Sequence, residues 1–360
     1  CLCLCLQIVV LLLCCKEHSA DISCRNGAGE PVDWCFIIYK LPRYKIGEVA
    51  SGVDYMYLDS SVGSWQTSNF QSRISREHTE TALYGKGLQD QYFPQSKISL
   101  YALYNDYSLC LTLVCVTEKA WTVVCAHPAG VLLFDHSQGF WLSHSIPLLS
   151  SFPERGYLYP SSGKVNSHTA LCVTYEYQQF LCIVKQMSYL YPRFYNCSVP
   201  ATFLAELLLL AQLCEGTIPL LPSERRMEQL FSLRGEKFFS FVKSEQFLDD
   251  IYTGWVAPVL DADLLVETWQ RLGHELPSNC SLPKHTMNIR RIQLPASALF
   301  HSHYDHSKWC VPRAYEDQLN CLGDLNRERA QMWHGAGLLS SFNPVIYKAF
   351  REVVDWYIGC

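Results

Sequence analysis

The stretch "GVLLFDHSQGFWLSHS", residues 130–145, decides the fold of the first half of the chain. It contains two apolar, strand-like runs, at 130–135 and 139–145, and three residues separate them. Two such runs joined by so short a polar connection are typical of a β-hairpin. Further runs rich in β-branched and aromatic residues at 32–39 and 97–106 have the same character. We therefore predict a β-sheet in the first half.

The second half has a more helical pattern. Apolar residues recur at spacings of three and four in four stretches, which favours amphipathic helices at 201–214, 237–251, 261–272 and 344–357. The stretch 287–295 is strand-like, and 151–167 has the Pro, Gly and Ser content of a linker. We therefore predict an α/β or α+β chain with a first half at 21–150 and a second half at 168–360.

Residues 1–20 have the character of a secretory signal peptide. An uncharged run of 15 residues is too short to span a bilayer, and the small residues Ser19 and Ala20 follow it. Because the run lacks an initial Met, we expect the signal to be incomplete. No later apolar run is long enough to span a membrane, so we expect no membrane segment in the mature chain.

Cysteine content and charge indicate the compartment. Without the signal, 13 of the 18 cysteines remain, which predicts disulfides and at least one unpaired thiol. The glycosylation sequons at Asn196 and Asn279 agree with a lumenal route. The net charge of −5 argues against tight nucleic-acid binding at pH 7, but protonation of the 12 histidines in an acidic organelle would make the chain cationic.

The stretch "HSHYDHSKWC", residues 301–310, contains three histidines, an aspartate, a lysine and a cysteine, and it has three possible interpretations. Its histidines, Asp305 and Cys310 include good zinc ligands, but no Cys-x-x-Cys or His-Glu-x-x-His motif completes a set. A hydrated surface loop is the second interpretation. The third is phosphodiester chemistry, because in an extended segment His306 and Lys308 point to one face and Asp305 to the other. An imidazole can then attack phosphorus while the ammonium neutralises phosphate oxygens.

Motifs spread along the whole chain resemble those of the deoxyribonuclease II family. They occur in family order: "PVDW", "YKLP", "LYND", "GVLL", "LPSNCS", "HSKWC" and "GDLNR". The segments "CSVPATF", "FLDDI" and "ETWQR" look most like the beta isoform. The resemblance implies a phospholipase-D-like architecture of two pseudo-symmetric halves with a mixed sheet in each. It also implies a lysosomal acid endonuclease that degrades double-stranded DNA without sequence preference and with neither metal nor cofactor.

The resemblance assigns roles to residues of the second half. His306 would attack phosphorus or protonate the leaving oxygen, Lys308 would hold phosphate oxygens, and Asn326 would donate a hydrogen bond to them. Hydrolysis of a phosphohistidine would leave 3′-phosphate ends. Because one imidazole must be neutral while another is protonated, the rate should peak on the acid side of neutrality.

The first half would supply the complementary acid or base, for which His144 and His127 are the candidates. His144 lies in the second strand of the hairpin, where the family requires a histidine, although a buried core histidine is the simpler alternative. We also expect three residues to bind substrate, namely Asp324, Ser145 and Lys40.

The first-half motif departs from the family pattern. The family has His-Thr-Lys-Gly where this chain has His127, Pro128, Ala129 and Gly130, so the lysine is missing. Losing one ammonium should cost about 10²- to 10³-fold in rate, by analogy with an oxyanion donor. Two interpretations remain open. The chain is a catalytically impaired relative that binds nucleic acid, or residues 107–129 are not native coding sequence and His127 aligns by accident.

The resemblance also implies disulfides. The family pattern pairs Cys24 with Cys172 and Cys310 with Cys321. A third family bridge would need a cysteine near residue 339, where this chain has Leu339, so we expect Cys280 to be free. The pair Cys197 and Cys214 is a plausible addition, and a homodimer remains open.

Overall fold

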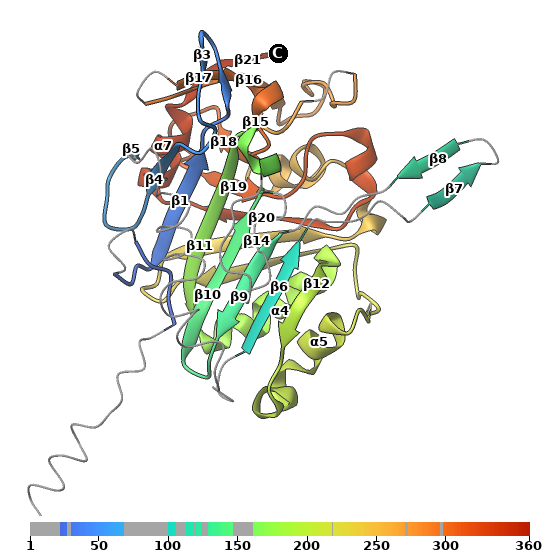
Figure 1. Ribbon diagram of the computed structural model, residues 1–360. Helices are drawn as coiled ribbons and strands as arrows, with labels where there is room; N and C mark the ends of the chain where they lie inside the picture. The colour runs from blue at the N-terminus through green and yellow to red at the C-terminus, as the bar shows by residue number, and fades with distance from the viewer. Residues whose placement is uncertain are drawn as a thin grey trace, which may run out of the picture.

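The computed structural model describes residues 22–26, 30–67, 100–105, 113–117, 120–123, 129–146, 161–217, 219–270, 273–295 and 298–360. Within these ranges the chain forms two large β-sheets and a small number of helices (Figure 1). The chain is therefore a mixed α+β protein in which sheet predominates. The signal peptide expected at 1–20 lies outside the described residues.

The first sheet has eight described strands. In spatial order they are β12 (Arg193–Ser198), β6 (Leu100–Asn105), β9 (Gly130–Phe134), β10 (Gln138–His144), β11 (His168–Glu176), β1 (Trp34–Lys40), β4 (Tyr55–Leu58) and β5 (Gln66–Thr67). Every described neighbour in this sheet is antiparallel. The prediction of a mixed sheet is thus wrong for the first half, because the strands follow one another through reversals such as the β9–β10 hairpin.

That hairpin is the one predicted from residues 130–145. Its turn is closed by Asp135, whose Oδ1 accepts hydrogen bonds from the backbone N–H groups of Ser137 and Gln138 at 2.7 and 3.0 Å. The carboxylate replaces backbone partners that a tight turn leaves unpaired. The strands predicted near 32–39 and 97–106 are present as β1 and β6.

The first sheet extends beyond the expected linker at 151–167. Strands β11 and β12 follow that stretch in sequence, yet they lie in the first sheet beside β10 and β6. Residues Leu171 and Val173 of β11 face the core shared with the second sheet, whereas Ala170 and Cys172 face a separate core on the outer side. Because both faces of β11 are buried, its sequence is a continuous apolar run.

The second sheet has nine described strands and is mixed. In order they are β13 (Arg225–Phe231), β14 (Lys237–Lys243), β20 (Ala336–Ser341), β19 (Asn320–Gly323), β18 (Trp309–Pro312), β15 (Leu264–Glu267), β16 (Thr286–Leu294) and β17 (Ala298–His301), with β21 (Val354–Tyr357) on β16. The pair β15 and β16 is parallel. The strand predicted at 287–295 corresponds to β16.

Two helix predictions in the second half are wrong. The stretch 237–251 forms β14 followed by a short 3-10 turn, and 261–272 contains β15. Both strands are buried on both faces: Phe238 and Leu265 enter the shared core, while Phe241 and Val266 enter the core on the far side. Apolar residues on both faces of a strand mimic helical spacing, which explains the error.

The helices cover and connect the sheets. They are α4 (Tyr177–Leu190), α5 (Leu204–Cys214), α6 (Ala257–Val259) and α7 (Pro344–Arg351), with 3-10 turns η2 (Ser161–Lys164), η3 (Ala201–Phe203), η4 (Glu245–Phe247), η6 (Ser302–Tyr304), η7 (Arg329–Trp333) and the π-helical turn η5 (Tyr252–Val256). The helix predicted at 201–214 is present as η3 and α5. The one predicted at 344–357 ends at Arg351 and gives way to β21.

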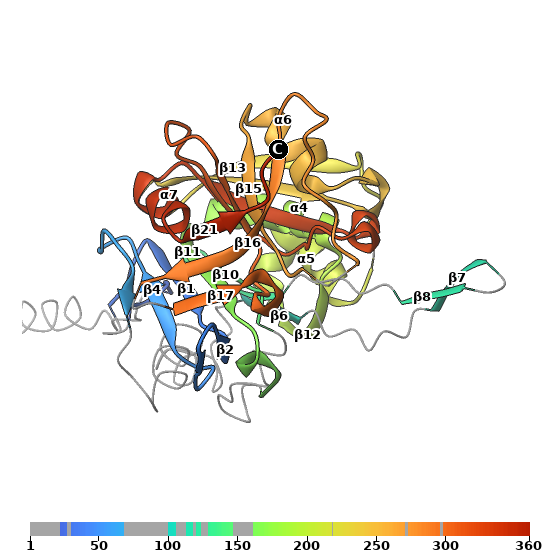
Figure 2. The ribbon, with the colours of Figure 1, turned by 90° about the horizontal axis from the view of Figure 1, so that it is seen from above.

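Packing joins the two sheets. Helix α4 contacts β11 of the first sheet and β13 and β14 of the second. The largest apolar core contains Tyr39 from β1 together with Ile289 from β16 and Trp309 from β18. A small sheet of β2 (Tyr44–Lys45) and β3 (Glu48–Val49) lies against β17, where the Ile46 N–H donates to the Leu299 carbonyl at 2.7 Å (Figure 2).

The cysteine-rich segment 107–129 is described only in part. Strands β7 (Leu113–Thr117) and β8 (Ala120–Val123) pair with each other and project away from the two sheets (Figures 1 and 2). Residue 129 rejoins the first sheet directly before β9.

Candidate functional site

The two sheets meet at the start of β11. Ser167 and Asp305 form a parallel bridge. The Ser167 N–H donates to the Tyr304 carbonyl at 2.8 Å, and the His306 N–H donates to the Ser167 carbonyl at 2.9 Å. The segment between η6 and β18 is thereby held alongside the first sheet. This contact brings the predicted His306 and Lys308 next to residues of the first half.

His306 lies between two rings. The centroid of its ring is 4.2 Å from the ring centroid of Trp269 and 5.4 Å from that of His168. The rings of His306 and His168 are nearly perpendicular. His306 itself is half-buried, whereas His168 is fully buried. The ring of His306 is therefore fixed from inside the protein while part of it still reaches the surface.

Lys308 reaches back to the backbone of His306. Its Nζ donates to the His306 carbonyl at 2.7 Å, and its side chain is buried. Its positive charge acts on His168 and on Asp324. Lys308 thus places one positive charge where the two sheets meet, next to the half-exposed imidazole of His306.

Asp305 anchors the segment to the first sheet. It accepts a hydrogen bond from the Tyr39 hydroxyl and another from the Ser307 N–H, the latter at 2.8 Å. The Trp309 indole N–H lies 3.2 Å from the Tyr39 oxygen, and all of these groups are buried. A carboxylate whose oxygens are held in this way fixes the backbone directly before His306.

The first sheet contributes Lys40 and Ser145, both predicted to bind substrate. Lys40 is the cross-strand partner of His168, and its Nζ donates to the carbonyls of Gly163 and Asn166. Burial lowers the pKa of Lys40 to about 7, although Asp305 opposes this effect. Below that pH the side chain is an ammonium.

Ser145 and His144 lie where β10 ends. The Ser145 Oγ accepts from the Thr169 N–H at 3.0 Å and lies 3.4 Å from Nδ1 of His168. His144 pairs with Ala170 and is buried, and burial lowers its pKa to about 4. At pH 5 its imidazole is neutral, which suits a base better than an acid.

Asn326 and Asp324 belong to the loop after β19. The Asn326 Oδ1 accepts from the backbone N–H of Trp269 at 3.2 Å, so Asn326 holds the backbone of the residue whose ring packs on His306. Asp324 is bonded to the Gly337 N–H at 2.8 Å, and burial raises its pKa to about 7.

Arg327 fixes this loop from the other side. Its guanidinium donates to the Asp250 carboxylate at 2.9 Å, to the Thr253 hydroxyl at 3.2 Å and to the Asn288 amide oxygen. The ion pair is almost fully buried. The "GDLNR" motif therefore contains Asn326, which lies beside the site, and Arg327, which holds the loop in place.

The first-half motif is only partly visible. His127 lies outside the described residues. Ala129 is buried and lines a small hollow between the sheets together with Trp141, Asp324 and Gly337. The position that carries lysine in the family pattern therefore lines the same hollow as Asp324.

The cysteine predictions have mixed outcomes. The disulfide between Cys24 and Cys172 is present, as is the one between Cys197 and Cys214. The predicted Cys310 and Cys321 bridge is absent: the two residues are directly opposed on β18 and β19, but both thiols are free. Burial raises the pKa of the Cys310 thiol, which disfavours the thiolate that forms a disulfide.

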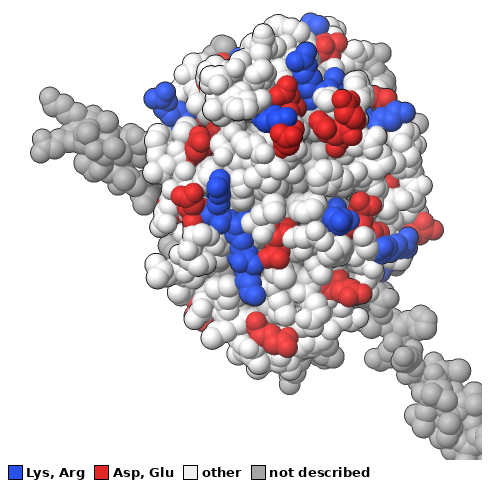
Figure 3. All heavy atoms as spheres, turned by 180° about the vertical axis from the view of Figure 1, so that it is seen from behind, with Lys and Arg blue, Asp and Glu red and all other residues white. Residues whose placement is uncertain are grey.

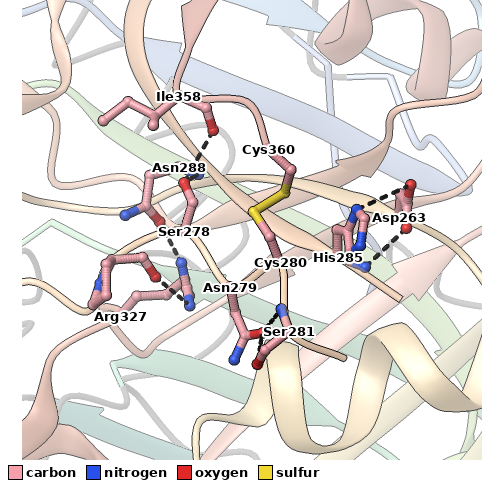
Figure 4. The surroundings of a disulfide bond; sticks show 11 residues. Asp263, Ser278, Asn279, Cys280, Ser281, His285, Asn288, Arg327, Ile358 and Cys360 are labelled. Carbon is pink, nitrogen blue, oxygen red and sulfur yellow. Dashed lines mark hydrogen bonds and ion pairs between the residues drawn. A yellow bond between two sulfur atoms is a disulfide. The ribbon is translucent and has the colours of Figure 1, made fainter. Parts of the chain in front are cut away.

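The expectation that Cys280 is free is wrong. Cys280 is bonded to Cys360, a partner at the end of the chain that the family pattern did not indicate (Figure 4). Beside it the predicted sequon residue Asn279 accepts from the Ser281 N–H at 3.1 Å, at the edge of a hollow of about 630 Å³. The other sequon residue, Asn196, is half-buried in β12.

The described ranges contain no group of three His, Cys, Asp or Glu side chains arranged to hold a metal ion, so the zinc interpretation has no donor set there. Within the same ranges, no helix combines the length and apolar character needed to cross a membrane. On the face shown in Figure 3, basic and acidic side chains are interspersed.

Sequence reasoning missed His168, Trp269 and Tyr39. All three are brought to His306 or Asp305 by long-range contacts that no local spacing reveals. The one available signal was the position of His168, a histidine at the start of the apolar strand "HTALCVTYE", where a buried imidazole needs a special reason.

Comparison with known proteins places these residues in context. A family model described as Deoxyribonuclease II matches residues 23–360. Deoxyribonuclease-2-beta of Homo sapiens is 40% identical over 348 residues, which cover 95% of this chain and 92% of that protein. Deoxyribonuclease-2-alpha of Sus scrofa is 34% identical over 94% of this chain and 91% of its own length. Plancitoxin-1 of Acanthaster planci is 31% identical over 99% of this chain and 97% of its own length.

Proposed function

The chain belongs to the deoxyribonuclease II family, and from this membership we propose that it is an acid endodeoxyribonuclease that hydrolyses double-stranded DNA. We propose further that cleavage needs no divalent metal and leaves 3′-phosphate ends. The disulfides Cys24–Cys172 and Cys280–Cys360 support an oxidising, lumenal route, and a lysosomal location follows from the proposed acid activity.

The observation that carries this proposal is the convergence of His306 and Lys308 with Lys40 and Ser145 where the sheets meet. Two ammonium groups that both act on His168, next to the half-exposed imidazole of His306, supply positive charge for a phosphate. Such preorganised charge is a large source of transition-state stabilisation in phosphoryl transfer. The two sheets would correspond to the two halves of a phospholipase-D-like fold.

The proposed reaction has two steps. In the first, the lone pair of a neutral His306 nitrogen attacks phosphorus, the bond to the 5′ oxygen breaks, and that oxygen takes a proton from an acid. In the second, water attacks the phosphohistidine and the phosphorus–nitrogen bond breaks, which yields the 3′-phosphate. Lys308 would neutralise phosphate oxygens in both steps. His144 and His127 stay the predicted sources of the complementary acid or base.

One observation favours a second function. Ala129 is buried beside Asp324 and offers no cation at the position where the family pattern has lysine. A chain that lacks this charge would bind DNA and cleave it slowly or not at all. The alternative is therefore an impaired relative that acts as a nucleic-acid-binding protein.

Plasmid nicking by the secreted protein at pH 5 in excess EDTA tests the proposal, with end-group analysis of the products. We expect metal-free nicking with 3′-phosphate ends, and a loss on the order of 10⁴-fold in His306→Ala. The matched control is His303→Ala, a neighbouring exposed histidine, which should cleave normally. Absence of cleavage by the unmodified protein, with DNA binding retained, would instead establish the impaired relative.

A further inference from the structure

His168 is a buried histidine for which the proposed reaction has no role. It begins β11 at the contact between the sheets, and its side chain has no exposed surface. A fully buried histidine in an apolar strand is unusual unless its nitrogens are used. Within the described part of the chain, Nε2 of His168 has no hydrogen-bond partner.

The other nitrogen indicates which tautomer is present. Nδ1 of His168 lies 3.4 Å from the Ser145 Oγ, which accepts from the Thr169 N–H at 3.0 Å and lies 3.4 Å from the Thr169 carbonyl. If the serine hydroxyl donates to that carbonyl, its oxygen is left to accept from Nδ1–H. In a neutral imidazole one nitrogen donates and the other accepts. Nε2 is then the acceptor.

The geometry toward His306 suits a hydrogen bond between the rings. The centroids are 5.4 Å apart and the planes meet at 82°. A linear N–H···N bond of about 2.9 Å, extended by two ring radii of roughly 1.1 Å, gives nearly the same separation. The centroid separation therefore leaves room for such a bond when a nitrogen of His306 points at His168, and catalytic hydrogen bonds are often long before substrate binds.

The surroundings keep His168 neutral. Burial, followed by the charges of Lys40, His306 and Lys308, lowers the pKa of His168 well below its usual range. Lys40 faces it from β1, His306 and Lys308 from the segment before β18, and the uncharged Ser145 from the end of β10. Asp305 and Asp54 act on Lys40 and not directly on His168. The imidazole therefore remains an acceptor at acid pH.

We propose that His168 is the positioning residue for His306: its Nε2 accepts the N–H of the inner ring nitrogen of His306 and so leaves the lone pair on the outer nitrogen. This inference rests on the proposed function. It gives His168 the task that a carboxylate performs for histidine in hydrolytic triads, but without a negative charge. No proton passes to His168, because the charged form is disfavoured there.

Two substitutions at this position test the proposal. His168→Leu removes the acceptor and keeps an apolar volume, whereas His168→Gln retains an acceptor oxygen. We expect His168→Leu to lower kcat by roughly 10²-fold with KM changed little, and His168→Gln to retain most of kcat. The control is His334→Leu, at a buried histidine between η7 and β20 outside the site, which should keep normal kinetics.

A second readout does not depend on DNA cleavage. Diethyl pyrocarbonate modifies neutral imidazole, and peptide mass spectrometry gives the extent at His306 as a function of pH. Because an acceptor stabilises the imidazolium, the midpoint of this profile should move about one pH unit lower in His168→Leu and little in His168→Gln. Identical profiles in all variants would overturn the proposal. Loss of nicking in every protein, with the shift intact, would overturn the proposed function alone.

Discussion

The rings of His168 and His306 lie nearly perpendicular to each other with centroids 5.4 Å apart, although one residue begins a strand of the first sheet and the other precedes a strand of the second. The bridge between Ser167 and Asp305 holds them there. The site therefore exists only when the two sheets are packed together. Substitutions that loosen this contact should reduce activity without touching the reacting groups.

Lys40 should make DNA binding depend on pH near neutrality. Because burial lowers the pKa of Lys40 to about 7, its ammonium is present below that pH and is lost as the pH rises through it. We expect the dissociation constant of the unmodified protein for a short duplex to rise severalfold between pH 6 and pH 8. In Lys40→Met the same change of pH should raise it less. Fluorescence anisotropy at constant salt measures this. Lys45→Met, which removes an ion-paired neighbour, is the control, and equal pH dependence in Lys40→Met and the unmodified protein would contradict the assignment.

Ala129→Lys should increase nicking. The new side chain would extend from a buried position toward the hollow that Asp324 also lines. There its positive charge would lower the raised pKa of the Asp324 carboxyl group and pair with the ionised form. Restoring this cation should raise kcat by about 10²-fold, which is the rate effect of one hydrogen-bond donor in an oxyanion hole. Ala129→Met adds similar length without charge and should bring no gain. If both variants fold and neither is faster, the missing lysine does not limit this chain.

Tyr39→Phe should weaken the anchor of the active segment. The substitution removes the hydroxyl that donates to Asp305 and leaves a buried carboxylate short of one partner. We expect the free energy of unfolding to fall by about 1–3 kcal/mol, measured by urea titration. Tyr44→Phe, at an exposed tyrosine, should change it by less than about 0.5 kcal/mol. A loss no larger than that of the control would remove Asp305 from its anchoring role.

Local patterns predicted the local features. The hairpin at 130–145 was predictable because two strands and an Asp135 turn lie in one short stretch. His306 and Lys308 could be proposed as a pair because a single residue, Ser307, separates them in sequence. The strand at 237–243 was mistaken for a helix, since burial on both faces erases the period-2 pattern.

Features that depend on contacts between distant parts of the chain could not be predicted from the sequence. Cys360 as the partner of Cys280 and Lys40 as the neighbour of His168 depend on pairings between distant strands. The order of strands in the first sheet, with β11 after the expected linker, decides which residues meet His306. Motifs therefore indicated residues from both halves, such as His306 and Lys40, but they did not indicate His168, which lies between them.

Trapping of the covalent intermediate tests the central claim most directly. A brief reaction with a short duplex at pH 5 in EDTA, stopped in alkali where phosphohistidine is stable, would be followed by peptide mass spectrometry. We expect a nucleotide joined through its 3′-phosphate to His306, present in the unmodified protein and in His303→Ala. Steady cleavage with the adduct on another residue, or cleavage that persists in His306→Ala, would contradict the account.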